Sequence, residues 1–245
     1  MEILAVNGSP RGSRGTTHLV LRRLLEGAEA EGARCRLVEL KDLDIRPCLG
    51  ELDCWFKTPG RCIIADAMEE LLPAVARADA LVLATPVFAD GPSALTKLFA
   101  DRLIPLLEPF FELRDGHFRH PKRQGINVAK TALVSTCGYW ELDNFDVVVE
   151  WARRLTAQFD ATFAGALVRP HAPILERFEQ AGKEPPRVYQ AAFEAGRQLV
   201  TQETIDEDVL AGVSRPLLPA KFYLMGANRF FETELEKLEK RTSGD

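Results

Sequence analysis

The sequence lacks several features that mark particular protein classes. No apolar run approaches the roughly 18–20 residues that a membrane-spanning helix needs. There is no basic excess, because 36 acidic residues outnumber 31 lysines and arginines and leave a net charge of −5. A general nucleic-acid binder needs a basic face, so we expect no nucleic-acid partner. The five cysteines are an odd number, which does not suit an extracellular disulfide framework.

The first residues also lack the pattern of a secretory signal. They contain Glu2 and only a very short apolar run, whereas a signal starts basic and stays apolar for longer. We therefore expect a cytoplasmic location and no membrane contact. The 46% hydrophobic and 27% charged residues are ordinary for a globular protein, and 245 residues allow one large domain or one and a half.

Short apolar runs alternate with helical periodicity over most of the chain. Ile3 to Val6 is fully apolar, as expected of a parallel strand covered on both faces. Leu21, Leu24, Leu25 and Ala28 then recur at the spacing of one helix face. The alternation predicts an α/β protein: a flavodoxin-like, doubly wound, five-stranded parallel sheet with the order 2-1-3-4-5. We expect strands at 3–6, 35–40, 80–84, 131–136 and 162–168, with helices near 21–31, 68–75, 95–103, 145–159 and 187–200.

The connections carry further expectations. Residues 41–65 are predicted to be irregular, and 85–92 to form a loop. Asp66 and Glu69 read as a capping box, while Pro73 predicts a kink or a later helix start. We expect a domain at 1–203 and a C-terminal helical extension at 204–245. The extension's apolar residues should pack on the chain's own core or on a second subunit: Phe222, Tyr223, Leu224, Met225, Phe230 and Phe231.

The loop after the first strand, NGSPRGSRGTTHLV from residue 7, predicts a phosphate site. Open doubly wound sheets bind ligands beyond the carboxyl ends of their strands. A helix begins directly after this loop, and its free N–H groups and dipole favour an anion. Three glycines allow close backbone approach, and hydroxyls and arginines supply donors. The alternative is a plain turn in which Thr16 or Thr17 is only the helix N-cap.

Two nucleotide fingerprints are absent from this loop. It does not contain G-x-x-x-x-G-K-[ST], nor G-x-G-x-x-G with an acidic residue ending the second strand. A mononucleotide such as FMN therefore suits the loop better than ATP or NAD.

Four segments together resemble the NADPH-dependent FMN reductase family, in the branch that contains the iron–sulfur flavoproteins. They are GSPRGSRGTT at 8–17, PCLGELDCWFKTPGRC at 47–62, TPVFADGPSALTKLFADR at 85–102 and STCGYW at 135–140. They occur in the family's order and spacing, over roughly the first 200 residues. The resemblance implies that the first segment wraps the FMN phosphate through Ser9, Arg11, Thr16 and Thr17.

The third and fourth segments are implied to hold the flavin ring. Backbone N–H groups along Pro86, Val87, Phe88 and Ala89 would reach its polar edge. Phe88 stands where the family often has Tyr, and Asp90 where it often has Gly. The fourth segment would bring backbone beside the pyrimidine edge. Tyr139 and Trp140 are candidates for stacking over the ring or lining the substrate slot, although aromatic residues there could equally be core or interface residues. The fourth-segment residues concerned are Thr136, Cys137, Gly138 and Tyr139.

Other polar residues near these segments are interpreted as structural. Lys97 and the Asp101-Arg102 pair match family residues, but an exposed helix face with an i, i+4 ion pair explains them better. Cys137 has no neighbouring base that would make it a nucleophile. The basic stretch His117, His120, Lys122 and Arg123 is expected to be a solvated loop rather than an NADPH phosphate site.

Three cysteines, Cys48, Cys54 and Cys62, lie on the stretch after the second strand. They match the first, third and fourth cysteines of the family's iron–sulfur branch, and Glu51 stands at the second. A [4Fe–4S] cluster ordinarily takes four thiolates, so we do not expect an intact cluster here. A zinc site is expected still less, because structural zinc prefers cysteine and histidine.

These observations predict an FMN-dependent oxidoreductase that passes electrons from NAD(P)H through bound FMN to a quinone, flavin or other small acceptor. The chemistry would belong to the cofactor, so no catalytic side chain is assigned. The resemblance also implies a homodimer or homotetramer. Two alternatives remain: an iron–sulfur flavoprotein that only carries electrons, and a module that binds another phosphate ligand without redox chemistry.

Overall fold

The computed structural model describes residues 1–185 and 187–242. It divides the chain into two compact units, Met1–Ser214 and Arg215–Asp245. The boundary predicted after residue 203 falls inside the first unit, because helix α8 (Glu207–Ser214) packs there on α7 (Val188–Thr201) and on the last strand of the sheet.

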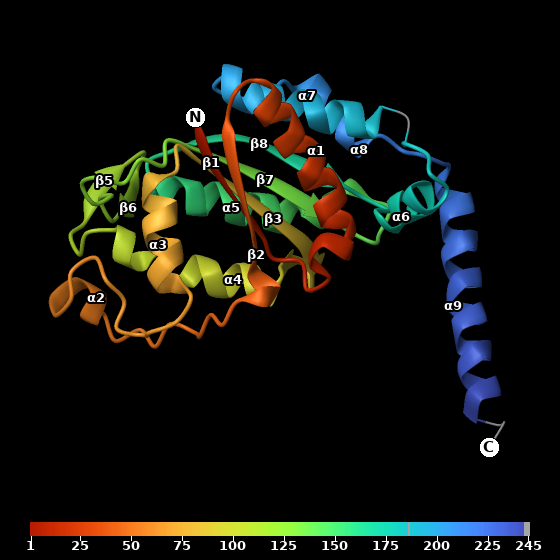
Figure 1. Cartoon of the computed structure of the whole chain (residues 1–245), viewed down its shortest axis with the longest axis horizontal. Coiled ribbons are helices and arrows are strands. Elements are labelled where there is room, and N and C mark those ends of the chain that lie inside the picture. Colours follow the sequence, from red (N-terminus) through yellow and green to blue (C-terminus); the bar gives the residue numbers. More distant parts are fainter. Residues whose placement is uncertain (186, 243–245) are drawn as a thin grey trace. The chain divides into compact units, whose positions relative to one another are not determined.

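A parallel sheet of five long strands forms the centre of the first unit (Figure 1). Its order is β2-β1-β3-β7-β8, which confirms the predicted 2-1-3-4-5 order of a doubly wound sheet. The three central strands are almost entirely buried, as the apolar runs at 3–6 and 80–84 predicted for two of them. The strands are β1 (Glu2–Asn7), β2 (Arg34–Glu39), β3 (Ala80–Phe88), β7 (Lys130–Thr136) and β8 (Thr162–Arg169).

Helices cover both faces of this sheet (Figure 1). On one face, α1 (Thr16–Ala30) packs against α7, and α8 lies beside them. On the other face, α3 (Met68–Arg77), α4 (Ala94–Asp101) and α5 (Asp146–Gln158) enclose the larger core cluster, with Leu71, Phe99 and Val148 fully inside it. The predicted helices are thus present, with ends that differ by a few residues.

Helix α3 differs from its prediction at Pro73. The helix begins at Met68 and runs past Pro73 to Arg77, so the later start is wrong, whereas the alternative of a kink stays a prediction. The N-cap residue is Ala67, but the Asp66 carboxylate still accepts a hydrogen bond from the Met68 N–H at 2.9 Å. Asp66 therefore satisfies a first-turn N–H, and its other bonds, described below, explain why it is buried.

Two hairpins were not expected. The predicted loop at 85–92 is instead the end of β3 plus β4 (Gly91–Pro92), which folds back against Val87 and Phe88. A second hairpin, β5 (Glu112–Arg114) with β6 (His117–Arg119), turns through Asp115 and Gly116. Both turn residues have positive φ, the geometry that the Asp-Gly pair favours in a two-residue hairpin loop.

Several short elements complete the first unit. Helix α2 (Asp53–Phe56) interrupts the stretch predicted to be irregular, and α6 (Pro173–Gln180) follows the last strand. Short 3-10 helices occupy Gly12–Arg14, Leu40–Asp42, Ile104–Leu106 and Leu142–Phe145.

The second unit consists mainly of α9 (Ala220–Thr242), so the predicted C-terminal helical extension is confirmed. No described residue of α9 is buried. Phe222, Leu224 and Phe231 are about 60% exposed, and the surface on which the extension's apolar residues pack stays a prediction. Across the described residues, no helix has both the length and the apolarity required to cross a membrane.

Candidate functional site

Three loops meet at the carboxyl edge of the sheet, after β1, β3 and β7. They come together because these strands are neighbours in register, Asn7 beside Ala84 and Pro86 beside Thr136. Ser93, just after the β3–β4 hairpin, donates from Oγ to the Gly8 carbonyl at 2.6 Å. The structure therefore brings together the first, third and fourth predicted segments.

Further hydrogen bonds tie the loops to one another. Ser135 Oγ donates to the Thr85 carbonyl at 2.9 Å, which joins β7 to β3. The Thr17 and Thr136 hydroxyls lie 2.7 Å apart, which joins the start of α1 to the end of β7. All three connections are buried, so the relative positions of the loops are set by the fold itself.

The β1–α1 loop is held in shape by its own backbone and by Asn7. The Asn7 side chain is fully buried and accepts from the Ser9 N–H at 3.1 Å, while its amide donates to Glu39 at 2.8 Å. Ser9 Oγ accepts from the Arg11 N–H at 3.3 Å, which leaves the hydroxyl hydrogen of Ser9 as a donor. Sequence reasoning missed the role of Asn7, although an amide at the end of an apolar strand was a usable signal.

Helix α1 begins without a side-chain cap. Gly15 is the N-cap residue, and Thr16 and Thr17 lie inside the first turn. The alternative in which either threonine is only the N-cap is therefore wrong. The His18 N–H donates to the Gly15 carbonyl at 3.1 Å, so the Thr16 and Thr17 N–H groups are the first-turn donors that an anion would find, aligned with the helix dipole.

Two glycines keep this loop close to its surroundings. A Cβ at Gly8 would lie 1.9 Å from Thr96 Oγ1 on α4. A Cβ at Gly15 would lie 2.6 Å from Ser9 Oγ and 3.2 Å from the Gly12 carbonyl oxygen, so the helix start approaches the loop closely. The loop thus offers backbone, the Ser9 hydroxyl and an uncapped helix start around one small space, a set of donors that fits a phosphate group.

Arg11 does not point into this space. Its guanidinium pairs with Glu176 of α6 at 2.6 Å, and the two side chains are 56% and 28% exposed. An exposed pair of this kind is worth only about 0–1 kcal/mol. A phosphate would therefore compete with Glu176 for Arg11 at small cost.

The third segment forms the β3–β4 hairpin. Its predicted residues Pro86 and Val87 are half-buried, whereas Phe88 and Ala89 are exposed. Ala89 and Asp90 have φ of 46° and 61°, the left-handed conformation of a two-residue turn. This explains why glycine is common where Asp90 stands, and why Asp, which tolerates that conformation, can replace it.

The fourth segment is anchored by the residues that follow β8. The Cys137 N–H donates to the Arg169 carbonyl at 3.1 Å, so this group is not available to a flavin. The His171 and Ala172 N–H groups donate back to the carbonyls of Tyr139 and Cys137. Burial raises the pKa of the Cys137 thiol, which agrees with its interpretation as a packed residue. Gly138 and Tyr139 remain exposed at the edge of the site.

Arg169 and His171, which sequence reasoning did not assign, support that anchor. Arg169 is fully buried, donates to the Val213 carbonyl at 2.8 Å and contacts His171 Nε2. The His171 ring stacks on Trp140 with centroids 4.3 Å apart. Burial, together with the nearby Arg169 charge, lowers the pKa of His171 to about 3, so the ring is neutral near pH 7.

Two charged residues of the third segment, Lys97 and Arg102, lie in different surroundings. Lys97 pairs with Asp101 on the exposed face of α4, as the structural interpretation predicted. Arg102 is instead buried, so its assignment to the solvated face is wrong. It pairs with Asp66 at 2.6 Å and also donates to the Arg46 carbonyl and to Cys62 Sγ. Arg102 thus holds the stretch after β2 against α4.

The basic stretch before β7 is mostly engaged within the fold. Lys122 donates to the Val128 carbonyl at 2.9 Å, and Arg123 pairs with Glu108 at 3.0 Å. The His120 ring lies 4.6 Å from the Trp55 ring. The side chains of this stretch are therefore held by contacts within the fold and are not simply solvated, as had been expected.

The three cysteines of the stretch after β2 lie near one another. Burial, together with negative charge at Cys62, Glu51 and Cys48, raises the pKa of Cys54 to about 11. Within residues 1–185 and 187–242, however, no three His, Cys, Asp or Glu side chains are arranged to hold a metal ion. Three thiols and a carboxylate also fall short of the four thiolates of a [4Fe–4S] cluster. The residues do not fit such a cluster, and its expected absence stays a prediction.

Comparison with known proteins begins with the family. Residues 1–121 match the family model described as NADPH-dependent FMN reductase, a shorter span than the 200 residues expected. An iron–sulfur flavoprotein of Methanocaldococcus jannaschii is 36% identical over 106 residues, 43% of this chain and 53% of that protein. One from Archaeoglobus fulgidus is 33% identical over 105 residues, 43% of this chain and 46% of that protein. The chain thus spans about half the length of these relatives.

Solved structures share the fold at low sequence identity. An NAD(P)H:quinone oxidoreductase from Methanothermobacter marburgensis superposes with a TM-score of 0.57 at 16% identity, covering 81% of this chain and 96% of that one. An FMN-dependent NADH-azoreductase from Bacillus anthracis gives 0.55 at 12%, covering 82% and 97%. These likenesses support the flavodoxin-like architecture alone. Together, these comparisons show a chain with a flavodoxin-like fold whose residues 1–121 are similar to the NADPH-dependent FMN reductase family.

Proposed function

We propose that the protein is an FMN-dependent oxidoreductase that takes electrons from NAD(P)H and passes them to a quinone, a flavin or another small acceptor. The observation that carries this proposal is the set of three loops tied together at one sheet edge, next to an uncapped helix start. The family match over residues 1–121 supports FMN as the ligand of that edge.

The chain's own residues would bind and orient the cofactor. Ser9, Thr16 and the first-turn N–H groups of α1 would hold the phosphate, with Arg11 released from Glu176. The β3–β4 hairpin from Pro86 to Ala89 and the exposed Gly138 and Tyr139 would border the ring. When bound, FMN would supply the electron transfer.

Two exposed aromatic side chains would shield the bound ring from water. Phe88 is 51% exposed and Tyr139 is 67% exposed, so both rings are accessible to a ligand at this edge of the sheet. Thr17 and Thr136, whose hydroxyls bond to each other, would act as positioning residues because they fix the helix start against β7.

The proposal is tested by titrating the apoprotein with FMN and following flavin fluorescence. Ser9→Ala with Arg11→Ala should weaken FMN binding roughly tenfold or more, about 1.4 kcal/mol. Glu176→Ala is the matched control, since it removes the partner from which Arg11 must be released. It should leave the affinity unchanged or raise it by up to about fivefold. An unchanged affinity in the Ser9, Arg11 variant would overturn the phosphate assignment.

The second candidate is an iron–sulfur flavoprotein that only carries electrons, as the names of the curated relatives suggest. The visible spectrum of protein purified without oxygen separates the candidates. Flavin bands alone favour the reductase, and a broad additional shoulder with near four irons per chain favours the electron carrier. A colourless protein that FMN does not stabilise against heat favours a non-redox phosphate-binding module.

A further inference from the structure

A pocket of about 370 Å³ lies between the β5–β6 hairpin and the end of α5. Apart from Ala157 and Ala161, the residues that line it, His117 among them, carry charged or imidazole side chains. Positive side chains outnumber negative ones among the residues that line it, although the chain as a whole is acidic. Two carboxylates, Asp115 and Asp160, face four arginines, Arg114, Arg119, Arg153 and Arg154.

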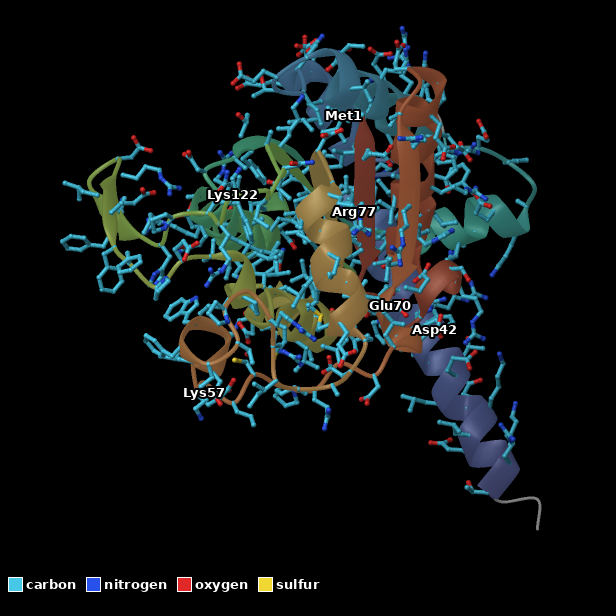
Figure 2. The ribbon with its side chains drawn as sticks, turned by 60° about the vertical axis from the view of Figure 1, so that its left-hand side comes forward. Met1, Asp42, Lys57, Glu70, Arg77 and Lys122 are labelled. Atoms are coloured by element: carbon cyan, nitrogen blue, oxygen red, sulfur yellow. The ribbon has the colours of Figure 1, made fainter. Side chains whose placement is uncertain are left out.

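This pocket is separate from the three-loop site. Asp160 and Ala161 directly precede β8, so the pocket lies at the edge where the strands begin. Helix α5 starts after β7 on the opposite edge, and its 13 residues span about 20 Å. In Figure 2, Lys122, which follows the hairpin, lies toward Met1 and Arg77 rather than toward Asp42, which marks the carboxyl edge.

Two of the four arginines have structural partners. Arg114 donates to the Ala157 carbonyl at 2.8 Å and pairs with Glu112, so it caps the end of α5 and fixes the hairpin over it. Arg154 pairs with Glu150 one turn earlier, at 2.6 Å. These bonds account for the charges of both residues.

The other two arginines have no carboxylate partner within the described chain. The Arg153 guanidinium lies 4.8 Å from the centre of the Phe163 ring, which orients its plane and leaves its N–H edge available. Arg119 donates only to the neighbouring Phe118 carbonyl, at 3.0 Å. They line the same pocket from its two sides, the hairpin and α5.

We propose that this pocket binds a small organic phosphate, held by Arg119 and Arg153. A planar guanidinium donates two parallel N–H bonds to a phosphate, and two such groups on opposite walls can grip one phosphoryl group. The volume exceeds what a single inorganic ion needs and lies at the low end for small-molecule sites. The polar lining suits a short hydroxylated or carboxylated carbon chain.

The test is isothermal titration of the full chain, saturated with FMN so that the β1–α1 loop is occupied. The probe is 3-phosphoglycerate, and glycerate is its match without the phosphate. We expect 3-phosphoglycerate to bind with a dissociation constant below about 1 mM, and glycerate not to bind. Arg119→Gln with Arg153→Gln should lose roughly tenfold or more in affinity.

Two further variants separate recognition from net charge. Arg34→Gln with Arg36→Gln removes two exposed arginines from β2 and should bind the probe like the wild type. Arg119→Lys with Arg153→Lys keeps the charge but loses the paired donors, and should be intermediate. The proposal fails if the wild type does not bind the probe, if glycerate binds equally well, or if the β2 variant loses as much affinity as the pocket variant.

Discussion

The buried pair of Arg102 and Asp66 gives the sharpest test of how the first unit is held together. Their side chains are 1% and 0% exposed, and two hydrogen bonds join them at 2.6 and 3.1 Å. Removing one partner of such a pair leaves a buried charge uncompensated and costs about 3–5 kcal/mol. In the variant Arg102→Met, the Asp66 carboxylate would still accept hydrogen bonds from the N–H groups of Arg46 and Met68. We therefore expect this variant to lose about 3 kcal/mol of unfolding free energy, the low end of that range.

The assay is urea unfolding followed by circular dichroism at pH 7. Lys97→Met is the matched control, because Lys97 lies on the same helix and pairs with Asp101, but both side chains are about half exposed. This control should lose less than about 1 kcal/mol. Equal losses in the two variants would refute the reasoning, because they would mean that burial does not raise the cost of losing the partner.

The pair also predicts a pH dependence. Burial opposes the charge of Asp66, but hydrogen bonds from Arg102 and from backbone N–H groups outweigh it and lower the pKa of the carboxyl. A lowered folded-state pKa contributes stability above the unfolded value of about 3.9, and this stability is lost as pH falls through the folded value. The gap between wild type and Arg102→Met should therefore narrow below about pH 4.

Three further predictions follow from other residues. The pKa of His171 is lowered to about 3 in the folded chain, whereas its value in the unfolded chain is about 6.5. As the pH falls below 6.5 the unfolded chain takes up the proton first, so the free energy of unfolding should decrease between pH 6.5 and pH 3. His171→Gln should flatten that part of a pH–stability curve, and parallel curves would contradict the assignment. Thr17→Val breaks the bond to Thr136 and should cost about 1 kcal/mol in urea unfolding, with part recovered when Thr136→Val is added. Phe231→Glu should lower the oligomeric mass in sedimentation without moving the unfolding midpoint, if exposed α9 contacts a second subunit.

The sequence predicted the sheet well, because its signal is local. A run such as Ala80 to Ala84 can be buried on both faces only as a central parallel strand, and the strand order follows from the connections. The start of α1 was also predictable, since glycines and hydroxyls gather directly after an apolar strand. Register in the sheet then placed the third and fourth segments beside it.

What could not be predicted depends on contacts between distant residues. Arg102 follows an exposed Asp101 on the same helix, and nothing local shows that Asp66, 36 residues earlier, draws it inside. Arg11 resembles a phosphate ligand in sequence, yet its partner in the structure comes from α6. The β3–β4 hairpin was missed because its turn, Ala89-Asp90, contains no glycine despite positive φ at both residues.

The hydrogen bonds among the three loops have a consequence for how variants should be interpreted. Because Ser93, Ser135 and Thr17 fix the loops during folding, little ordering remains to be done when a ligand arrives. Affinity at this edge and local stability are then thermodynamically linked, and a substitution that loosens one tie weakens binding without touching the ligand. The amount of ligand that copurifies with each variant therefore reports whether the three loops are still held together. It should be compared with an unfolding curve before any residue is assigned a direct contact with the ligand.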